Sequence, residues 1–254
     1  MDSGHVQAAR AARPGRTLRP AKITPMKLLV LDTSTEWCSA ALSLDGRALV
    51  RRVLAEQRHS SLLLPMVDEL LGEAGLGLRQ LDGIGYGAGP GSFTGLRIAC
   101  AVTQGLAFGA DLPVVGVSTL ESIAEQTGAK RVLTVLDARM AEVYWAAYRR
   151  DDDGWRALSA PQLALPESVA LPEDGEWVGA GNGFAALGEV LRPHLATQLA
   201  RIDETLMPDA AAMVPLAVHA FERGEGVDAA LAAPIYLRDK VALTVDERRA
   251  RLPA

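Results

Sequence analysis

The residues best suited to chemistry lie in a glycine-rich segment over residues 82–109. Six of the positions 83–95 are glycines, a density typical of a loop whose backbone approaches another group closely. The loop opens onto an apolar helix, whose free N-terminal amides could bind an anion. Gly89, Gly91 and Ser92 are therefore candidate ligand contacts, and a tight strand-to-helix connection is the alternative explanation.

No established phosphate or nucleophile motif fits this segment. A dinucleotide-binding fingerprint and a Walker loop both fail, because positions that need glycine or lysine hold other residues, such as Pro90 and Leu96. A nucleophile elbow centred on Ser92 would need glycine two residues away on each side, where Pro90 and Thr94 stand. We therefore predict no catalytic residue in this loop.

Two aspartates that follow apolar runs form a second group of candidates. The first turn reads Asp32-Thr33-Ser34, and the second reads Asp137-Ala138-Arg139. Neither turn contains the glycine that would let the backbone close on a phosphate. Arg139 could bind an anion, or it could pair with Asp137 or Glu142. Any ligand site that includes Asp32, Thr33, Ser34 and Arg139 is therefore expected to be weak or vestigial.

The histidines and cysteines do not suggest a metal site. The four histidines are scattered, and none has a second ligand at a convincing helical spacing: His5, His59, His194 and His219. Cys38 and Cys100 lie in apolar segments with no CxxC pattern, so we expect buried free thiols in a reducing compartment. We predict no bound metal.

Charge divides the 254-residue chain into two parts. Residues 1–25 carry five basic residues against one aspartate, a net +4, which leaves −9 for residues 26–254 because the whole chain carries −5. We expect a disordered extension over residues 1–25; an arginine arm on nucleic acid is the alternative, and Met26 could be the true start. The acidic remainder disfavours strong independent binding to nucleic acid.

No apolar run approaches the roughly 18 residues of a membrane span, so we expect a cytoplasmic protein.

Periodicity predicts a similar order of elements in both halves of the chain. The first half should contain strands over 28–32, 38–44, 47–54, 82–88 and 113–117, with helices over 60–75 and 92–109. The second half should contain a strand near 176–178 and helices near 183–200 and 209–223.

A short internal repeat relates the two halves. Val30-Leu31-Asp32, followed by Glu36, Ala40 and Ala41, is echoed by Val135-Leu136-Asp137, followed by Glu142, Ala146 and Ala147. A period of about 105 residues is too long for a solenoid. It predicts two duplicated α/β subdomains with mixed sheets flanked by helices, over residues 26–129 and 130–254.

Two predicted helices are apolar over more of their surface than one sheet needs. A core helix needs an apolar stripe a little over 100° wide, and both helices exceed it. We predict a partner interface on the first helix at His59, Leu63, Met66, Val67 and Leu70. On the second helix, the small residues Gly95, Ala99 and Thr103 would allow close helix packing. Burial of both helices by the rest of the chain is the alternative.

Five segments carry a family resemblance. They are the glycine-rich segment, VLDTSTEWCSAAL (30–42), QRHSSLLLPMVDELL (57–71), VLDARMAEVYWAAY (135–148) and PIYLRDKVA (234–242). Together they resemble the TsaB family, also called YeaZ, over nearly everything from Met26 onward. The resemblance implies the fold of the actin, Hsp70 and sugar-kinase (ASKHA) class, with two RNase H-like subdomains.

The resemblance also implies a function in tRNA modification. A TsaB-like chain would be the noncatalytic dimerization subunit of the machinery that makes N6-threonylcarbamoyladenosine at tRNA position 37. It would bind and activate the TsaD transferase, join the ATPase TsaE in a larger complex, form a homodimer in isolation, and meet tRNA only through the complex. It would need no cofactor alone and could bind ATP or ADP weakly at a shared interface. TsaD carries a His-x-x-x-His metal pair where this chain has Thr119 and Ile123.

Two other classes remain as alternatives. The first is an enzyme, either an ASKHA-type nucleotide-binding phosphotransferase or an M22-like metallopeptidase. The missing phosphate glycines and the absence of an HExxH motif disfavour both enzymes. The second is a plain homodimeric nucleotide-binding protein.

Overall fold

The structure is a computed structural model that describes residues 26–44 and 46–238. The prediction of a disordered extension falls on residues 1–25, which lie outside the described residues. Over the described part, the predicted strands and helices of the first half are confirmed to within one or two residues at most ends.

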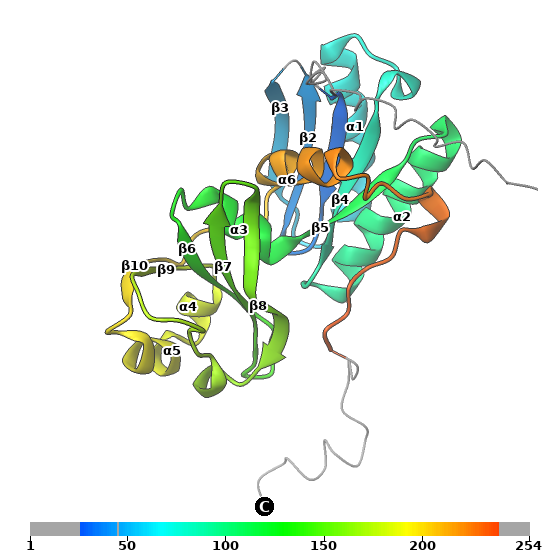
Figure 1. Cartoon of the computed structure of the whole chain (residues 1–254). Coiled ribbons are helices and arrows are strands. Elements are labelled where there is room, and N and C mark those ends of the chain that lie inside the picture. Colours follow the sequence, from blue (N-terminus) through cyan, green and yellow to red (C-terminus); the bar gives the residue numbers. More distant parts are fainter. Residues whose placement is uncertain (1–25, 45, 239–254) are drawn as a thin grey trace, which may run out of the picture.

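Two five-stranded sheets with the same strand order form the two halves (Figure 1). The first sheet consists of β1 (Leu28–Asp32), β2 (Trp37–Leu44), β3 (Arg47–Leu54), β4 (Gly83–Gly89) and β5 (Val114–Ser118), in the order β3-β2-β1-β4-β5. The second consists of β6 (Arg131–Asp137), β7 (Val143–Asp151), β8 (Gly154–Ala164), β9 (Trp177–Ala180) and β10 (Leu199–Asp203), in the order β8-β7-β6-β9-β10. In each sheet the first three strands are antiparallel and the last two run parallel to the first. The predicted duplication into two RNase H-like units is thereby confirmed.

Strand pairing corrects the repeat at the level of single residues. Val30 lies opposite Ala41, whereas Val135 lies opposite Trp145 rather than Ala147. Six residues (33–38) separate the paired residues Asp32 and Ser39, whereas five residues (138–142) separate Asp137 and Val143. The second spacing is therefore one residue shorter than the first, and the matches of Glu36, Ala40 and Ala41 to Glu142, Ala146 and Ala147 are wrong.

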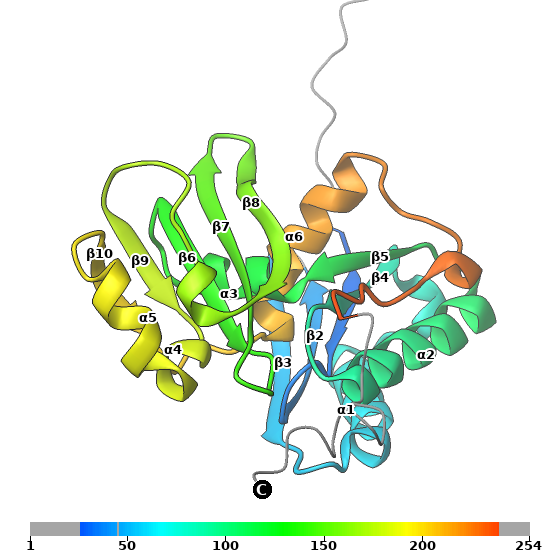
Figure 2. The ribbon, with the colours of Figure 1, turned by 90° about the horizontal axis from the view of Figure 1, so that it is seen from below.

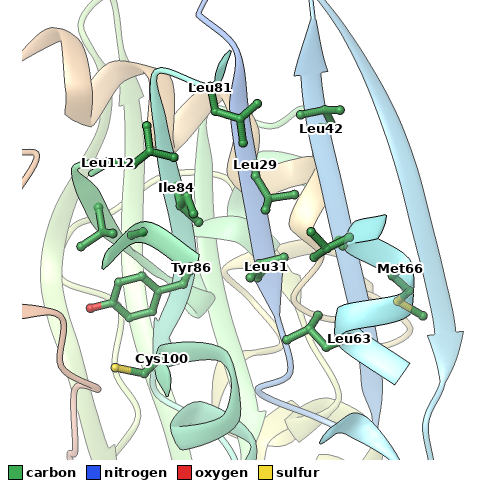
Figure 3. Close-up of a cluster of buried hydrophobic side chains, with 14 of the residues drawn as sticks. Leu29, Leu31, Leu42, Leu63, Met66, Leu81, Ile84, Tyr86, Cys100 and Leu112 are labelled. Carbon is green, nitrogen blue, oxygen red and sulfur yellow. The ribbon is translucent and has the colours of Figure 1, made fainter. Parts of the chain in front are cut away.

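Helices cover both faces of each sheet. They are α1 (His59–Ala74), α2 (Phe93–Ala110), α3 (Thr119–Gln126), α4 (Gly183–Ala186), α5 (Gly188–Leu195) and α6 (Ala210–Glu222), with short 3₁₀ turns η1 (Leu78–Gln80), η2 (Pro166–Ser168) and η3 (Ala229–Leu231). On one face of the first sheet, Leu63 and Met66 of α1 pack against the strand residues Leu31 and Leu42, with Tyr86 and Cys100 in the same cluster (Figure 3). The expected burial of both cysteines is confirmed.

Two helices cross between the halves. α3 follows the last strand of the first sheet, yet Leu120 and Ile123 pack into the core of the second sheet beside Leu136. α6 follows the last strand of the second sheet, yet it lies across the free face of the first (Figure 1), where Met213 and Ala217 pack beside Val30. Each of these two helices therefore packs on the sheet of the other half, and the division between residues 129 and 130 stays a prediction.

The second half departs from the prediction in one segment. One helix was predicted over residues 183–200, whereas the structure has two short helices, α4 and α5, followed by the strand β10. Leu187 lies between the helices with φ −130°, outside the helical region, and Gly188 follows it. β10 is a short edge strand paired on one side only, to β9, so it carries little of the alternation that marks a buried strand.

Candidate functional site

A cavity of about 620 Å³ lies between the two halves of the molecule. The turns after β1 and β6 line it from the two sheets, and the loops before α1 and α2 close it on the side of the first sheet. Residues 235–238 form a further wall. Its volume is within the range of small-molecule sites in proteins, roughly 300–1,000 Å³. This cavity brings together Ser34, Gly91, Ser92 and Arg139 from the predicted ligand site.

Asp32 lies beneath this cavity rather than in its wall. It ends β1 and is fully buried. Its Oδ2 accepts a hydrogen bond from Ser34 Oγ at 3.1 Å, whereas its Oδ1 has no hydrogen-bond partner among the described residues. Burial raises the pKa of the Asp32 carboxyl to about 7, and the hydrogen bond from Ser34 opposes that rise. Asp32 is thus a buried acid that does not line the cavity.

The glycines of the loop before α2 serve close backbone packing. A Cβ on Gly91 would lie 2.5 Å from the Ser34 carbonyl oxygen, and one on Gly95 would overlap the Thr33 carbonyl oxygen. Thr33 Oγ1 donates to the Gly95 carbonyl at 2.6 Å, and the Ser92 N–H donates to the Ser34 carbonyl at 2.7 Å. The turn after β1 is therefore seated on the N-terminal end of α2. The predicted tight connection is present, while Thr33 and Gly89 do not line the cavity.

Arg139 is engaged with its own turn. Its guanidinium lies 3.2 Å from Asp137, and its backbone N–H donates to Asp137 Oδ1 at 2.8 Å. The other arginine of the cavity wall, Arg238, lies 2.6 Å from Glu142. In the described part of the chain, both arginines that line the cavity therefore already have a carboxylate partner. A phosphate entering the cavity would have to compete for them.

The predicted partner residues of α1 are buried by the chain itself. Leu63, Val67 and Leu70 are at most 1% exposed, and His59 and Met66 are 8% and 9% exposed. They face the first sheet, and His59 Nε2 lies 2.8 Å from the Thr35 carbonyl oxygen at the cavity. This regular stripe is the core-facing side of the helix, so these five residues do not present their side chains to a partner.

The predicted partner residues of α2 are also buried by the chain itself. Ala99 and Thr103 are fully buried and Gly95 is buried against the turn after β1. The small side chains at a spacing of four allow close packing, as predicted, but the packed neighbour is this chain's own sheet and turn. The predicted contact of these residues with a second subunit stays a prediction, and it would require buried side chains to become exposed.

Other residues of the two helices are open to solvent. We define the α1–α2 surface as Leu64 and Pro65 of α1 with Ala101, Gly105 and Phe108 of α2, all of which are exposed. Phe108 is 82% exposed and Leu64 is 44% exposed. The sequence does hold a signal for Leu64 and Phe108. On its helix, each lies between the regularly spaced positions that face the core.

Residues 26–44 and 46–238 contain no group of three or more histidines, cysteines or acids arranged to hold a metal ion. Thr119 and Ile123 are fully buried. Thr119 Oγ1 donates to the Pro90 carbonyl at 2.5 Å. In the same described part, no helix has the length and apolar character needed to span a membrane.

Comparison with known sequences identifies relatives over most of the chain. The family described as "TsaD: tRNA N6-adenosine threonylcarbamoyltransferase" matches residues 52–244. The "tRNA threonylcarbamoyladenosine biosynthesis protein TsaB" of Escherichia coli K12 is 42% identical over 228 residues, which are 85% of this chain and 96% of the relative. The TsaB protein of Haemophilus influenzae is 38% identical over 230 residues, 85% of this chain and 95% of the relative.

Solved structures agree with these sequences. YeaZ from Pseudomonas aeruginosa is 42% identical and superimposes with a TM-score of 0.75, covering 84% of this chain and all of its own chain. A second P. aeruginosa protein, with similarity to the peptidase YeaZ, is 44% identical with a TM-score of 0.78 over the same shares. The strand order, the whole-length identity and these superpositions agree, and the chain belongs to the TsaB (YeaZ) family.

Proposed function

We propose that this chain is the noncatalytic scaffold subunit that binds and activates the TsaD transferase in N6-threonylcarbamoyladenosine modification of tRNA position 37. The observation that carries the proposal is the exposed α1–α2 surface. Phe108 projects from a helix whose neighbouring exposed residues, Ala101 and Gly105, are small. A large apolar side chain beside small residues on an open helix face suits insertion into another helical protein.

The cavity supports an accessory role. Among the described residues, its arginines are paired with carboxylates, and its acidic wall includes Glu36, Glu56 and Asp137. This arrangement suits weak binding of ATP or ADP at most, with further groups supplied across a subunit interface. The family model that matches this chain is named after the transferase. We infer that this chain lacks the metal chemistry that the resemblance implies for TsaD, because Thr119 and Ile123 stand where TsaD would have its paired histidines.

The α1–α2 surface also bears on the other expected partners, which are a second copy of this chain, TsaE and tRNA. A homodimer and the TsaD complex would compete for the α1–α2 surface, TsaE would join the larger assembly, and tRNA would bind only through it. We expect this assembly in the cytoplasm. The chain alone should neither hydrolyse ATP appreciably nor modify tRNA, whereas the reconstituted set should lose modification without it.

Two alanines two positions apart on α2 provide the test. Ala101 is exposed and Ala99 is fully buried. Ala101→Glu should remain folded, with a thermal midpoint close to that of the parent chain, but lose co-elution with the TsaD homologue and lose tRNA modification. Ala99→Glu should instead unfold the chain, because burying an unpaired charge costs several kcal/mol.

Ala185→Glu, on the exposed part of α4, is the matched control. It should retain both folding and TsaD binding. A folded Ala101→Glu variant that still binds TsaD would show that the partner surface lies elsewhere. Turnover of ATP by the purified chain alone would favour the phosphotransferase alternative, and release of peptide products would favour the metallopeptidase.

A further inference from the structure

Residues 232–238 form an extended segment that runs along one wall of the cavity from one half of the molecule to the other. The segment follows η3 and runs over the N-terminal end of α2 towards the centre of the molecule (Figure 2). It contains no helix or strand, and residues 235–238 line the cavity wall. It is therefore held by specific side-chain and backbone contacts rather than by a regular ladder.

Backbone contacts fix the segment to the first half. The Ile235 N–H donates to the Ala88 carbonyl at 2.7 Å. Tyr86 Oη accepts from the Ala233 N–H at 2.9 Å and donates to the Ala233 carbonyl at 3.1 Å. Gly89 makes this approach feasible, since a Cβ there would lie 2.7 Å from the Ile235 carbonyl oxygen.

An aromatic contact then attaches the segment to α2. The ring of Tyr236 lies 5.2 Å from the ring of Phe93, between centroids. Arg97 donates from Nε to Tyr236 Oη at 2.9 Å, and its guanidinium lies 3.8 Å from the Phe93 ring centroid. Tyr236 is still 42% exposed, so this anchor lies at the rim of the cavity and can be reached from outside.

An ion pair joins the end of the segment to the second half. Arg238 lies 2.6 Å from Glu142 and donates to the Ala138 carbonyl at 3.1 Å, with its side chain only 15% exposed. Both partners belong to the turn after β6. Three consecutive residues of that turn have positive φ, Arg139 at 63°, Met140 at 58° and Ala141 at 61°. Such a conformation is costly for non-glycine residues and persists only where surrounding contacts hold it.

We propose that residues 232–238 act as a releasable internal latch, which forms one wall of the cavity, ties the strained turn at 138–142 to α2, and frees that turn when it detaches. Ile235 is 48% exposed, and a segment held by a few rim contacts detaches more easily than the sheets on either side.

The latch also connects the cavity to the α1–α2 surface. Arg97 and Ala101 are both exposed and lie four residues apart on α2, on the same side of the helix. A protein partner that binds this surface and draws Arg97 into its own contacts would remove one anchor of Tyr236. By reciprocity, releasing the latch would alter the affinity for that partner by the same factor. This step rests on the proposed function; the latch itself does not.

Hydrogen exchange on the full chain tests the latch. Arg238→Ala removes a charged hydrogen-bonding group, and we expect backbone amides in residues 138–142 and 232–238 to exchange at least about tenfold faster. Glu142→Gln, on the other side of the cavity, should accelerate the same two stretches. The double variant should exchange little faster than either single variant, because each of the three proteins lacks the same ion pair between Arg238 and Glu142. Arg223→Ala, which removes an exposed pair with Glu225, is the matched control and should leave both stretches unchanged.

Two results would overturn the latch. One is acceleration confined to 232–238 with the turn at 138–142 unchanged, since the segment would then hold nothing. The other is uniform acceleration across both sheets, which would show general destabilisation. Adding excess TsaD homologue tests the coupling separately: protection of α2 together with loss of protection over 232–238 supports it, and protection of both refutes it. A failure of TsaD to bind would count against the proposed function and leave the exchange test of the latch intact.

Discussion

Replacing Asp32 by asparagine should remove a large share of the pH dependence of folding stability. The Asp32 carboxyl is fully buried, and its pKa rises from 3.8 to about 7, chiefly because burial disfavours the charged form. Between these values the folded chain holds a proton that the unfolded chain has released. Stability therefore falls as pH rises through this window, and above pH 7 the ionised group costs the folded state about 4 kcal/mol.

The assay is denaturant unfolding of the parent chain and Asp32→Asn at a series of pH values from about 4.5 to 8. Asparagine does not titrate, so the substitution itself changes stability by the same amount at every pH. The informative quantity is how the difference between the two free energies of unfolding changes with pH. We expect this difference to change by about 3 kcal/mol across the series, in favour of the variant at high pH. Glu121, whose burial also raises its carboxyl pKa to about 7, is present in both proteins and cancels. Asp153→Asn, at an exposed residue, is the control and should run parallel to the parent. Parallel curves for Asp32→Asn would refute the reasoning.

Two further substitutions test local conformation. Ala141→Gly should raise the free energy of unfolding by about 1 kcal/mol, because glycine adopts the positive φ of 61° without strain; a lower midpoint in urea would contradict the strain. Gly95→Ala should cost several kcal/mol, since its Cβ would overlap a backbone oxygen, whereas Gly105→Ala meets nothing within 4 Å and should stabilise α2 by roughly 0.5–1 kcal/mol. Equal thermal midpoints for those two variants would show that the close packing at Gly95 is not rigid.

The sequence predicted local elements well because their signals are local. Alternation on either side of Gly46 located β2 and β3, and the dense glycines before residue 92 located the loop that leads into α2. The exchange of α3 and α6 between sheets had no such signal. An apolar helix face shows that a cover exists, but it does not show which of two sheets provides it.

The candidate site was predicted in part for a related reason. The glycines at 91 and 95 did indicate close approach, and the approaching group is the turn at Thr33 and Ser34 rather than a ligand. In the same way, the regular apolar stripe through Leu63 and Leu70 marks the side of α1 that faces the core. Exposed residues such as Phe108 fall between the positions of the core-facing stripe. A search for regular apolar spacing selects the stripe and passes over them.

The exchange of helices between the two sheets also sets the order in which the protein can be completed during synthesis. All five strands of the first sheet have been made by Ser118, but α6, which covers one of their faces, begins only at Ala210. Until then Leu28, Val30 and Val115 lack the helix that buries them in the finished chain. Contacts between segments that are far apart in the sequence, such as α6 and the first sheet, form slowly. Until they form, the uncovered apolar strands can aggregate. The first sheet therefore has both of its faces covered only after α6 has left the ribosome.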